Sequence, residues 1–202
     1  GMEQNRSVFS LKNASGEGRI TVYRIFPGFE LIYNDLHMGY CRRAQAPVKN
    51  VIEINHCRQG RCECSFGSSV CRLAPGDCSV APLCRFKTDS CFPMKRYSGI
   101  TVLIQLDRIQ PRLQAMLEFL SIDLSLLRSS VYEKRRCCTI RTCASIEHIF
   151  AELYTVPENR KMGYIKVKLL ELLLFLCNLE NHECAVMCEP CGREQFLLVK
   201  QV

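Results

Sequence analysis

The chain has 202 residues, of which 48% are hydrophobic and 23% charged, so it can bury a continuous core without disulfides or a structural metal. Its 15 cysteines are an odd number, and the polar N-terminal segment has no apolar signal-peptide core, which predicts a reducing, cytoplasmic compartment and mostly free thiols. The net charge of +7 comes from scattered Lys and Arg. These residues form no basic helix face with interleaved aromatic residues, which argues against direct nucleic-acid binding.

Short strands separated by turns are predicted over residues 19–107, after a flexible N-terminus at residues 1–18. The runs "RITVYRIF" and "ELIYNDL" flank Pro27-Gly28, a turn signal between two β-branched and aromatic segments. "GITVLIQLD" (99–107) is the strongest strand pattern, since it is rich in Ile, Val and Leu. Many short strands with Gly and Pro turns indicate an antiparallel barrel or sandwich.

The stretch "EINHCRQGRCECSF" (53–66) combines a histidine with three cysteines. The strand pattern "VIEINHC" places Ile52, Ile54 and His56 on one face and Glu53, Asn55 and Cys57 on the other. Arg58-Gln59-Gly60 has the composition of a hairpin turn, after which Cys62, Cys64 and Phe66 share a face. Because a free cysteine packs as a small buried hydrophobe, a lining or packing role is favoured for Cys62 and Cys64.

The hydrophobic period changes to that of helices after Asp107. Apolar residues at helical spacing begin just beyond Pro111, which is acceptable in a first turn, and "SIEHIFAELY" is a second amphipathic segment. Thr155-Val156-Pro157-Glu158 has the form of a capping box that opens a long apolar helix. The longest apolar stretch (165–179) includes Lys166, Lys168 and Glu171 and is too short to span a bilayer, so the chain is predicted to be soluble.

Five segments in this order resemble the N-terminal sensor half of an AraC-type transcriptional regulator: "EINHCRQGRCEC", "LAPGDCSV", "FPMKRYSGITVLIQLD", "IEHIFAELY" and "KVKLLELLLFL". The resemblance covers nearly all of residues 15–202. It implies an α+β fold, in which an antiparallel, cupin-like β-barrel of the jelly-roll type (19–107) holds an effector. A helical dimerisation and packing subdomain (108–192) follows, and residues 193–202 begin a linker helix.

The DNA-binding half of such a regulator would follow residue 202. We therefore expect this chain to contact DNA only through a helix-turn-helix domain that it does not contain. Gly1 before Met2 is typical of a cleaved purification tag, which favours an excised domain.

The effector is expected inside the barrel, where alternate strand residues converge. The candidates for its pocket are Tyr23, Tyr33, Glu53, His56, Arg61 and Tyr97. Each has a structural alternative: the tyrosines can be core residues with satisfied hydroxyls, and Glu53 and Arg61 can form an ion pair across the hairpin. The effector itself is an unidentified small molecule.

The long apolar helix is the expected partner surface. Its stripe consists of Leu169, Leu172, Leu173 and Leu176, and it is consistent with intrachain packing or with a symmetric homodimer contact.

Two other functions remain open. A cupin metalloenzyme supplies two histidines two residues apart, a glutamate and a later histidine, whereas here His56 stands alone in its strand. A cysteine-based metal sensor could use His182, Cys184, Cys188 and Cys191, since thiolates and imidazole suit tetrahedral zinc. Because the chain is rich in cysteine throughout, a chance cluster is favoured. A redox sensor could use Cys137, Cys138 and Cys143, where the neighbouring cations of a basic segment would raise thiol reactivity. We expect no enzyme activity, no metal and no cofactor.

Overall fold

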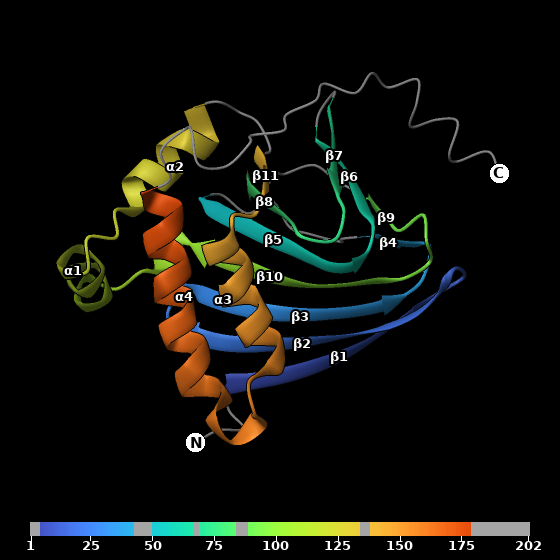
Figure 1. Cartoon of the computed structure of the whole chain (residues 1–202), viewed down its shortest axis with the longest axis horizontal. Helices are drawn as coiled ribbons and strands as arrows, with labels where there is room; N and C mark the ends of the chain where they lie inside the picture. The colour runs from blue at the N-terminus through green and yellow to red at the C-terminus, as the bar shows by residue number, and fades with distance from the viewer. Residues whose placement is uncertain (1–4, 43–49, 67–68, 84–88, 134–137, 179–202) are drawn as a thin grey trace.

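Two antiparallel sheets form most of the N-terminal part of the chain, and helices cover one face of the larger sheet (Figure 1). The computed structural model describes residues 5–42, 50–66, 69–83, 89–133 and 138–178. The seven-stranded sheet contains, in spatial order, β1 (Arg6–Asn13), β2 (Gly16–Phe26), β3 (Phe29–His37), β10 (Tyr97–Gln105), β5 (Val51–Gly60), β8 (Asp77–Pro82) and β11 (Cys138–Arg141). The four-stranded sheet contains β4 (Tyr40–Arg42), β9 (Asp89–Cys91), β6 (Cys62–Phe66) and β7 (Ser69–Leu73).

The helices follow the last central strand. They are η2 (Leu106–Arg108), α1 (Pro111–Phe119), α2 (Leu124–Glu133), α3 (Ala144–Thr155), η3 (Glu158–Arg160) and α4 (Lys161–Cys177). In Figure 1, α3 and α4 lie side by side across the large sheet. The predicted α+β class, with antiparallel cupin-like sheets followed by helices, is confirmed. No helix in the described ranges is long and apolar enough to cross a membrane.

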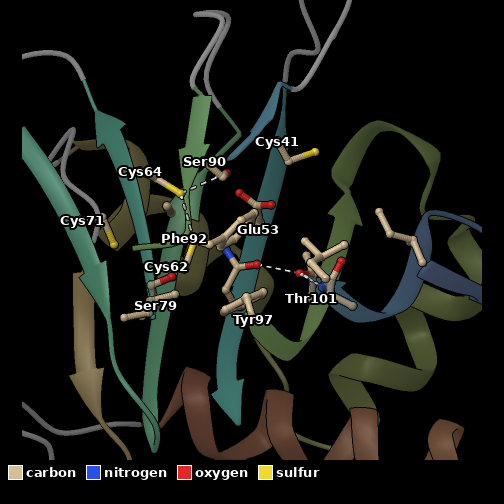
Figure 2. Close-up of a pocket in the computed structure, with 16 residues that line it drawn as sticks. Cys41, Glu53, Cys62, Cys64, Cys71, Ser79, Ser90, Phe92, Tyr97 and Thr101 are labelled. Carbon is tan, nitrogen blue, oxygen red and sulfur yellow. Dashed lines mark hydrogen bonds between the residues drawn. The ribbon is translucent and has the colours of Figure 1, made fainter. Parts of the chain in front are cut away.

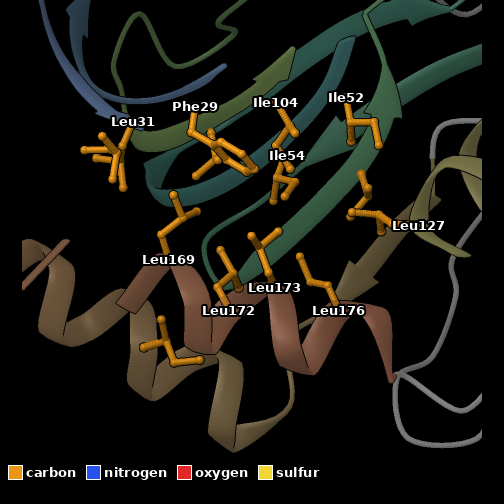
Figure 3. Close-up of a cluster of buried hydrophobic side chains, with 14 of the residues drawn as sticks. Phe29, Leu31, Ile52, Ile54, Ile104, Leu127, Leu169, Leu172, Leu173 and Leu176 are labelled. Carbon is orange, nitrogen blue, oxygen red and sulfur yellow. The ribbon is translucent and has the colours of Figure 1, made fainter. Parts of the chain in front are cut away.

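The main core lies between the large sheet and the helices (Figure 3). Strand alternation sends Ile54 of β5 and Val102 and Ile104 of β10 to this side, where they meet Leu169 and Leu173 of α4. Each fully buried aliphatic side chain contributes roughly 1.5–3 kcal/mol. This layer therefore supplies most of the hydrophobic stabilisation.

A second, smaller core lies between the two sheets. It contains Leu36, Met38, Cys57, Cys62, Leu73, Phe92 and Tyr97. The central strands of the large sheet, β5, β8 and β10, are thus buried on both faces: helices cover one, and the four-stranded sheet covers the other.

The predicted hairpin at Arg58-Gln59-Gly60 is wrong, although both of its strands exist. β5 pairs with β10 and β8, whereas β6 pairs with β7 and β9, so the chain crosses from one sheet to the other at Gly60. The backbone there has φ +81°, and a Cβ would lie 1.9 Å from the carbonyl oxygen of Arg96. Only glycine fits this crossing.

Two element boundaries also differ from the predictions. Within the segment 1–18, which was expected to be flexible, Arg6–Asn13 forms β1 and pairs along its whole length with β2. Its hydrophobic alternation is weak because all eight of its side chains are exposed or half-buried. The helical part also contains β11, which pairs with β8.

The capping box expected at Thr155 and Glu158 is absent. The Thr155 hydroxyl instead donates back to the Ala151 carbonyl at 3.1 Å. The Glu158 carboxylate accepts hydrogen bonds from the Tyr23 hydroxyl at 3.0 Å and from Lys161 Nζ at 2.9 Å. Through Glu158, the start of α4 is therefore attached to β2, the strand next to the edge of the large sheet.

The leucine stripe of α4 packs within the chain. Leu169, Leu172, Leu173 and Leu176 are all buried in the main core, so of the two uses the sequence allowed, intrachain packing is the one found. A homodimer cannot use these four side chains without unpacking the helix from the sheet.

The crossing glycine yields a stability prediction. We expect Gly60→Ala to lower the free energy of unfolding by at least about 3 kcal/mol, because a left-handed φ and a backbone clash act together. Gly76→Ala is the matched control: its φ is +85° but nothing lies within 4 Å of a Cβ, so it should lose only about 1–2 kcal/mol. Urea unfolding measures both, and equal losses would contradict the crossing geometry.

Candidate functional site

A cavity of about 120 Å³ lies between the two sheets (Figure 2). Its walls come from β2, β3, β5, β8 and β10 of the large sheet and from β4, β6, β7 and β9 of the small one. Protein interiors are close-packed and contain few voids. A void of this size, with several polar side chains set in a mainly apolar wall, is therefore the leading candidate for a ligand site.

Polar side chains cross the large sheet on the cavity face. The Thr101 hydroxyl of β10 donates to Asn55 Oδ1 of β5 at 2.7 Å and accepts from Asn34 Nδ2 of β3 at 3.0 Å. Asn55 is in register with Ser79 of β8. We call Asn34, Thr101, Asn55 and Ser79 the polar row. Their hydroxyl and amide groups lie on four neighbouring strands and can form hydrogen bonds with a ligand.

A second row crosses the small sheet and faces the cavity from the other side. Cys41 is in register with Ser90, Ser90 with Cys64, and Cys64 with Cys71. All four residues line the cavity, as does Cys62. The Sγ atoms of Cys62 and Cys64 are 3.5 Å apart, and Cys64 Sγ is 3.3 Å from Ser90 Oγ. We call these five residues the thiol row; Figure 2 shows its sulfur atoms.

Two of the six predicted pocket residues line this cavity. Glu53 and Tyr97 do so, and the Tyr97 ring stacks on Phe92 with centroids 5.2 Å apart. Burial raises the pKa of Tyr97, so its phenol stays protonated near neutral pH. The pair Phe92 and Tyr97 forms an apolar part of the wall.

Tyr23, Tyr33 and Arg61 are elsewhere. The two tyrosines lie on the helix side of the large sheet, where Tyr23 bonds Glu158 and the Tyr33 hydroxyl donates to the Leu153 carbonyl at 2.7 Å. They are core residues with satisfied hydroxyls, the structural alternative that the sequence left open. Arg61 is exposed and pairs with the buried carboxylate of Glu63 at 3.1 Å.

His56 also faces the helices and not the cavity. Its ring is only 2% exposed and stacks on Phe150 of α3, with centroids 4.0 Å apart. Nε2 lies 3.4 Å from Glu147 Oε2 and Nδ1 lies 3.0 Å from the Tyr154 hydroxyl. Because a carboxylate only accepts, Nε2 carries the proton of the neutral ring and Nδ1 accepts from Tyr154. His56 therefore joins the barrel to α3.

Burial lowers the pKa of His56, although the Glu147 carboxylate acts in the opposite direction. The folded protein thus holds a neutral imidazole at neutral pH. The hydroxyl of Thr142 also donates to Glu147 Oε2 at 2.8 Å and lies 2.6 Å from the carbonyl oxygen of Gly76. The network links β5, the turn before β8, and α3.

Among the described residues, no group of three or more His, Cys, Asp or Glu side chains could hold a metal ion. His56, the one histidine in the predicted barrel strand, lies on the far side of the sheet from the cavity. The other metal candidates, His182, Cys184, Cys188 and Cys191, lie outside the described residues, as does the expected linker helix.

The polar row was missed by sequence reasoning, yet its signal is visible in the sequence. In "GITVLIQ" Thr101 is the one polar residue of the central run, and Asn55 occupies the matching face of "VIEINHC". A hydroxyl or amide at alternate positions of a doubly buried strand must find a partner. The pairing order of the strands, which was unknown, decides which partner it finds.

Comparisons with known proteins give similarities of fold. No protein-family model matches the chain, and no curated protein matches it. Among solved structures, the AraC-like transcriptional activator CuxR is 11% identical with a TM-score of 0.45, and the match covers 95% of this chain and 67% of that one.

Two further solved structures are similar. Apo ToxT from Vibrio cholerae is 9% identical with a TM-score of 0.47, covering 72% of this chain and 54% of that one. A cupin 2 conserved barrel domain protein from Rhodopseudomonas palustris is 16% identical with a TM-score of 0.37, covering 62% and 90%. None of these similarities places a ligand, a metal or DNA in this chain.

The buried histidine predicts a pH dependence of stability. The unfolded chain takes up a proton at His56 near its ordinary pKa of about 6.5, whereas the folded state resists protonation. Stability from this group is therefore present above that pH and is lost as the pH falls through it. We expect His56→Gln to reduce the loss of unfolding free energy between pH 7.5 and 5.5.

The control for this measurement is His37→Gln, which changes an exposed histidine. It should leave the pH dependence of wild type unchanged. An identical pH dependence in His56→Gln and wild type would show that His56 is not held neutral by burial.

Proposed function

We propose that this chain is the ligand-sensing and dimerisation module of an AraC-type transcriptional regulator, with the cavity between the two sheets as its effector site. The single observation that carries the proposal is a cavity bordered by polar or thiol-bearing side chains in both sheets. Transcription would be controlled through a helix-turn-helix domain outside the described residues, and the protein would act in the cytoplasm. In this proposal the chain binds and signals without catalysing a reaction.

The volume and the lining residues of the cavity favour a small, uncharged effector. Its volume of about 120 Å³ is below the roughly 300 Å³ at which pockets for drug-sized ligands begin. The described lining residues include one carboxylate, Glu53, and no Lys, Arg or His, so an anion would gain no ion pair there. Hydroxyl, amide and thiol groups suit a neutral molecule that both donates and accepts hydrogen bonds.

A route from the cavity to the helices runs through β5. Asn55 faces the cavity, and the next residue, His56, contacts Tyr154 and Glu147 of α3 on the opposite face. A shift of β5 caused by the effector would therefore displace the hydrogen bonds that hold α3. Because α3 packs on α4, the same shift would reach the proposed dimer surface.

The dimer surface in this proposal is the outer face of α4. Val167 and Leu174 are seven residues apart, which is two helical turns, and their exposed fractions are 63% and 39%. A stripe with this spacing can pack against its own copy across a two-fold axis. It replaces the four buried leucines as the candidate contact.

A ligand screen tests the effector site. Small uncharged compounds should include one that raises the melting temperature, because saturation at 100 times Kd adds about 2.7 kcal/mol, or about 5–10 °C for a chain of this size. Thr101→Val removes the central hydroxyl of the polar row with little change in shape. It should abolish the shift, while Thr155→Val at the exposed end of α3 should retain it. Equal shifts in both variants would place the ligand elsewhere.

Sedimentation velocity tests the dimer surface. We expect the wild-type chain to sediment as a dimer and the double variant Val167→Glu, Leu174→Glu to be monomeric, because charges in an apolar contact are not compensated. Phe119→Glu is the control, since this α1 residue is 87% exposed and lies outside the proposed contact. A dimer that persists in the double variant would contradict the assignment.

A further inference from the structure

The thiol row allows the cavity to form bonds through sulfur, in addition to hydrogen bonds. Cys62 and Cys64 are two residues apart on β6, face the same way, and hold their Sγ atoms 3.5 Å apart. Cys62 is buried and Cys64 is half-buried at the cavity wall. Two thiols this close form a dithiol that can bind one atom from two sides.

A disulfide is a poor use of this pair. Residues two apart on a strand have Cα atoms about 6.7 Å apart, near the upper limit of about 6.8 Å and beyond the preferred 5.5–6 Å for a disulfide. The described lining residues also include no cation to stabilise a thiolate. Oxidation to a disulfide would require β6 to distort.

A tetrahedral zinc site is equally unsuited. Two thiolates at about 2.3 Å from zinc satisfy only half of its four ligands. Among the residues that the structure describes, no third donor converges with this pair to form a metal-binding group. The pair instead suits a ligand whose central atom forms bonds to two sulfurs and retains one bound hydroxyl group.

We propose that Cys62 and Cys64 bind trivalent arsenic hydroxide, As(OH)3, as the small uncharged ligand of this cavity. The inference rests on the proposed sensing function and names the chemical class of its ligand. Arsenous acid is uncharged at neutral pH, consists of four heavy atoms, and is soft enough to prefer sulfur. Its pyramidal centre holds two sulfurs at roughly a right angle, so chelation needs neighbouring thiols.

The reaction is a condensation without oxidation or reduction. Two As–O bonds break and two As–S bonds form, and the two S–H protons leave with the two hydroxyl groups as two molecules of water. Arsenic stays trivalent and keeps one hydroxyl group. Ser90 Oγ, 3.3 Å from Cys64 Sγ, stands beside the dithiol as a hydrogen-bond partner for that hydroxyl.

The test is adduct mapping on the native 202-residue chain. The reduced protein is incubated with one equivalent of arsenite, freed of excess reagent and digested with trypsin without added thiol. Cleavage after Arg61 and Arg72 releases "CECSFGSSVCR", whose only cysteines are Cys62, Cys64 and Cys71. We expect this peptide to carry one As(OH)3 less two molecules of water. Arsenic found only on other peptides would overturn the proposal.

Single variants locate the two sulfurs within that peptide. Cys62→Ser and Cys64→Ser should each weaken arsenite binding at this peptide at least about tenfold, because each breaks the pair whose Sγ atoms lie 3.5 Å apart and loses the effective concentration that this pair provides. Cys71→Ser is the matched control and should retain the adduct. Loss of the adduct in Cys71→Ser to the same extent would overturn the assignment to Cys62 and Cys64. The mapping of wild type does not depend on whether a variant folds.

The arsenite result and the sensing function can fail separately. If arsenite leaves the peptide unmodified while another uncharged compound gives a melting shift that Thr101→Val abolishes, the dithiol inference is wrong and the cavity remains the effector site. If arsenite modifies the peptide, but the ligand that raises the melting temperature does so equally in Thr101→Val and Thr155→Val, the dithiol inference stands. In that case the proposal that the polar row senses the effector is wrong.

Discussion

The burial of the central strands of the large sheet on both faces is the constraint on which this structure depends. Because side chains alternate along a strand, β5 and β10 must each satisfy two different environments at once. The residue types at even and odd positions therefore differ. At even positions, Ile54 and Val102 complete an apolar core with the helices. At odd positions, Asn55 and Thr101 supply hydrogen-bonding groups to the cavity. A one-residue slip in register would exchange the two sets and bury the polar groups against leucine.

The same alternation connects the cavity to the helices. The polar row holds three strands together by hydrogen bonds between Asn34, Thr101 and Asn55, so a ligand that displaces one of these side chains acts on the others. On the opposite face, His56 follows Ile52 and Ile54 along β5, and its ring forms a hydrogen bond with α3 and stacks on it. The helix layer is therefore attached to β5 by directional contacts as well as by apolar packing.

Much of the fold was readable from the sequence because local patterns determine it. The β2–β3 turn at Gly28, the faces of "VIEINHC" and a buried α4 all follow from turn chemistry and hydrophobic period. The strand predicted at 99–107 exists but lies two residues earlier, at 97–105. Pairing between distant strands does not follow from such patterns. For this reason the composition around Gly60 predicts a hairpin turn although Gly60 marks a crossing between sheets, and the weakly alternating Arg6–Asn13 does not predict a strand although it forms β1.

The candidate site was predictable only in part, for the same reason. Of the six residues expected to line an effector pocket, Glu53 and Tyr97 border the cavity. Tyr23, Tyr33 and His56 lie on the helix side instead, because alternation tells which residues share a face but not which face meets the helices. Cys64 and Cys71 meet through strand pairing within the small sheet, which no spacing in the sequence reveals.

The most direct test of this account compares two neighbours on β8 that face opposite sides of the large sheet. Ala81 lines the cavity, whereas Val80 is buried in the helix-side core. In urea unfolding, Ala81→Leu should cost less than about 1 kcal/mol because the added atoms enter open space, while Val80→Phe should cost about 2–3 kcal/mol by overpacking a filled core. Equal costs, or a larger cost for Ala81→Leu, would contradict the central claim that one sheet separates a filled core from an open binding cavity.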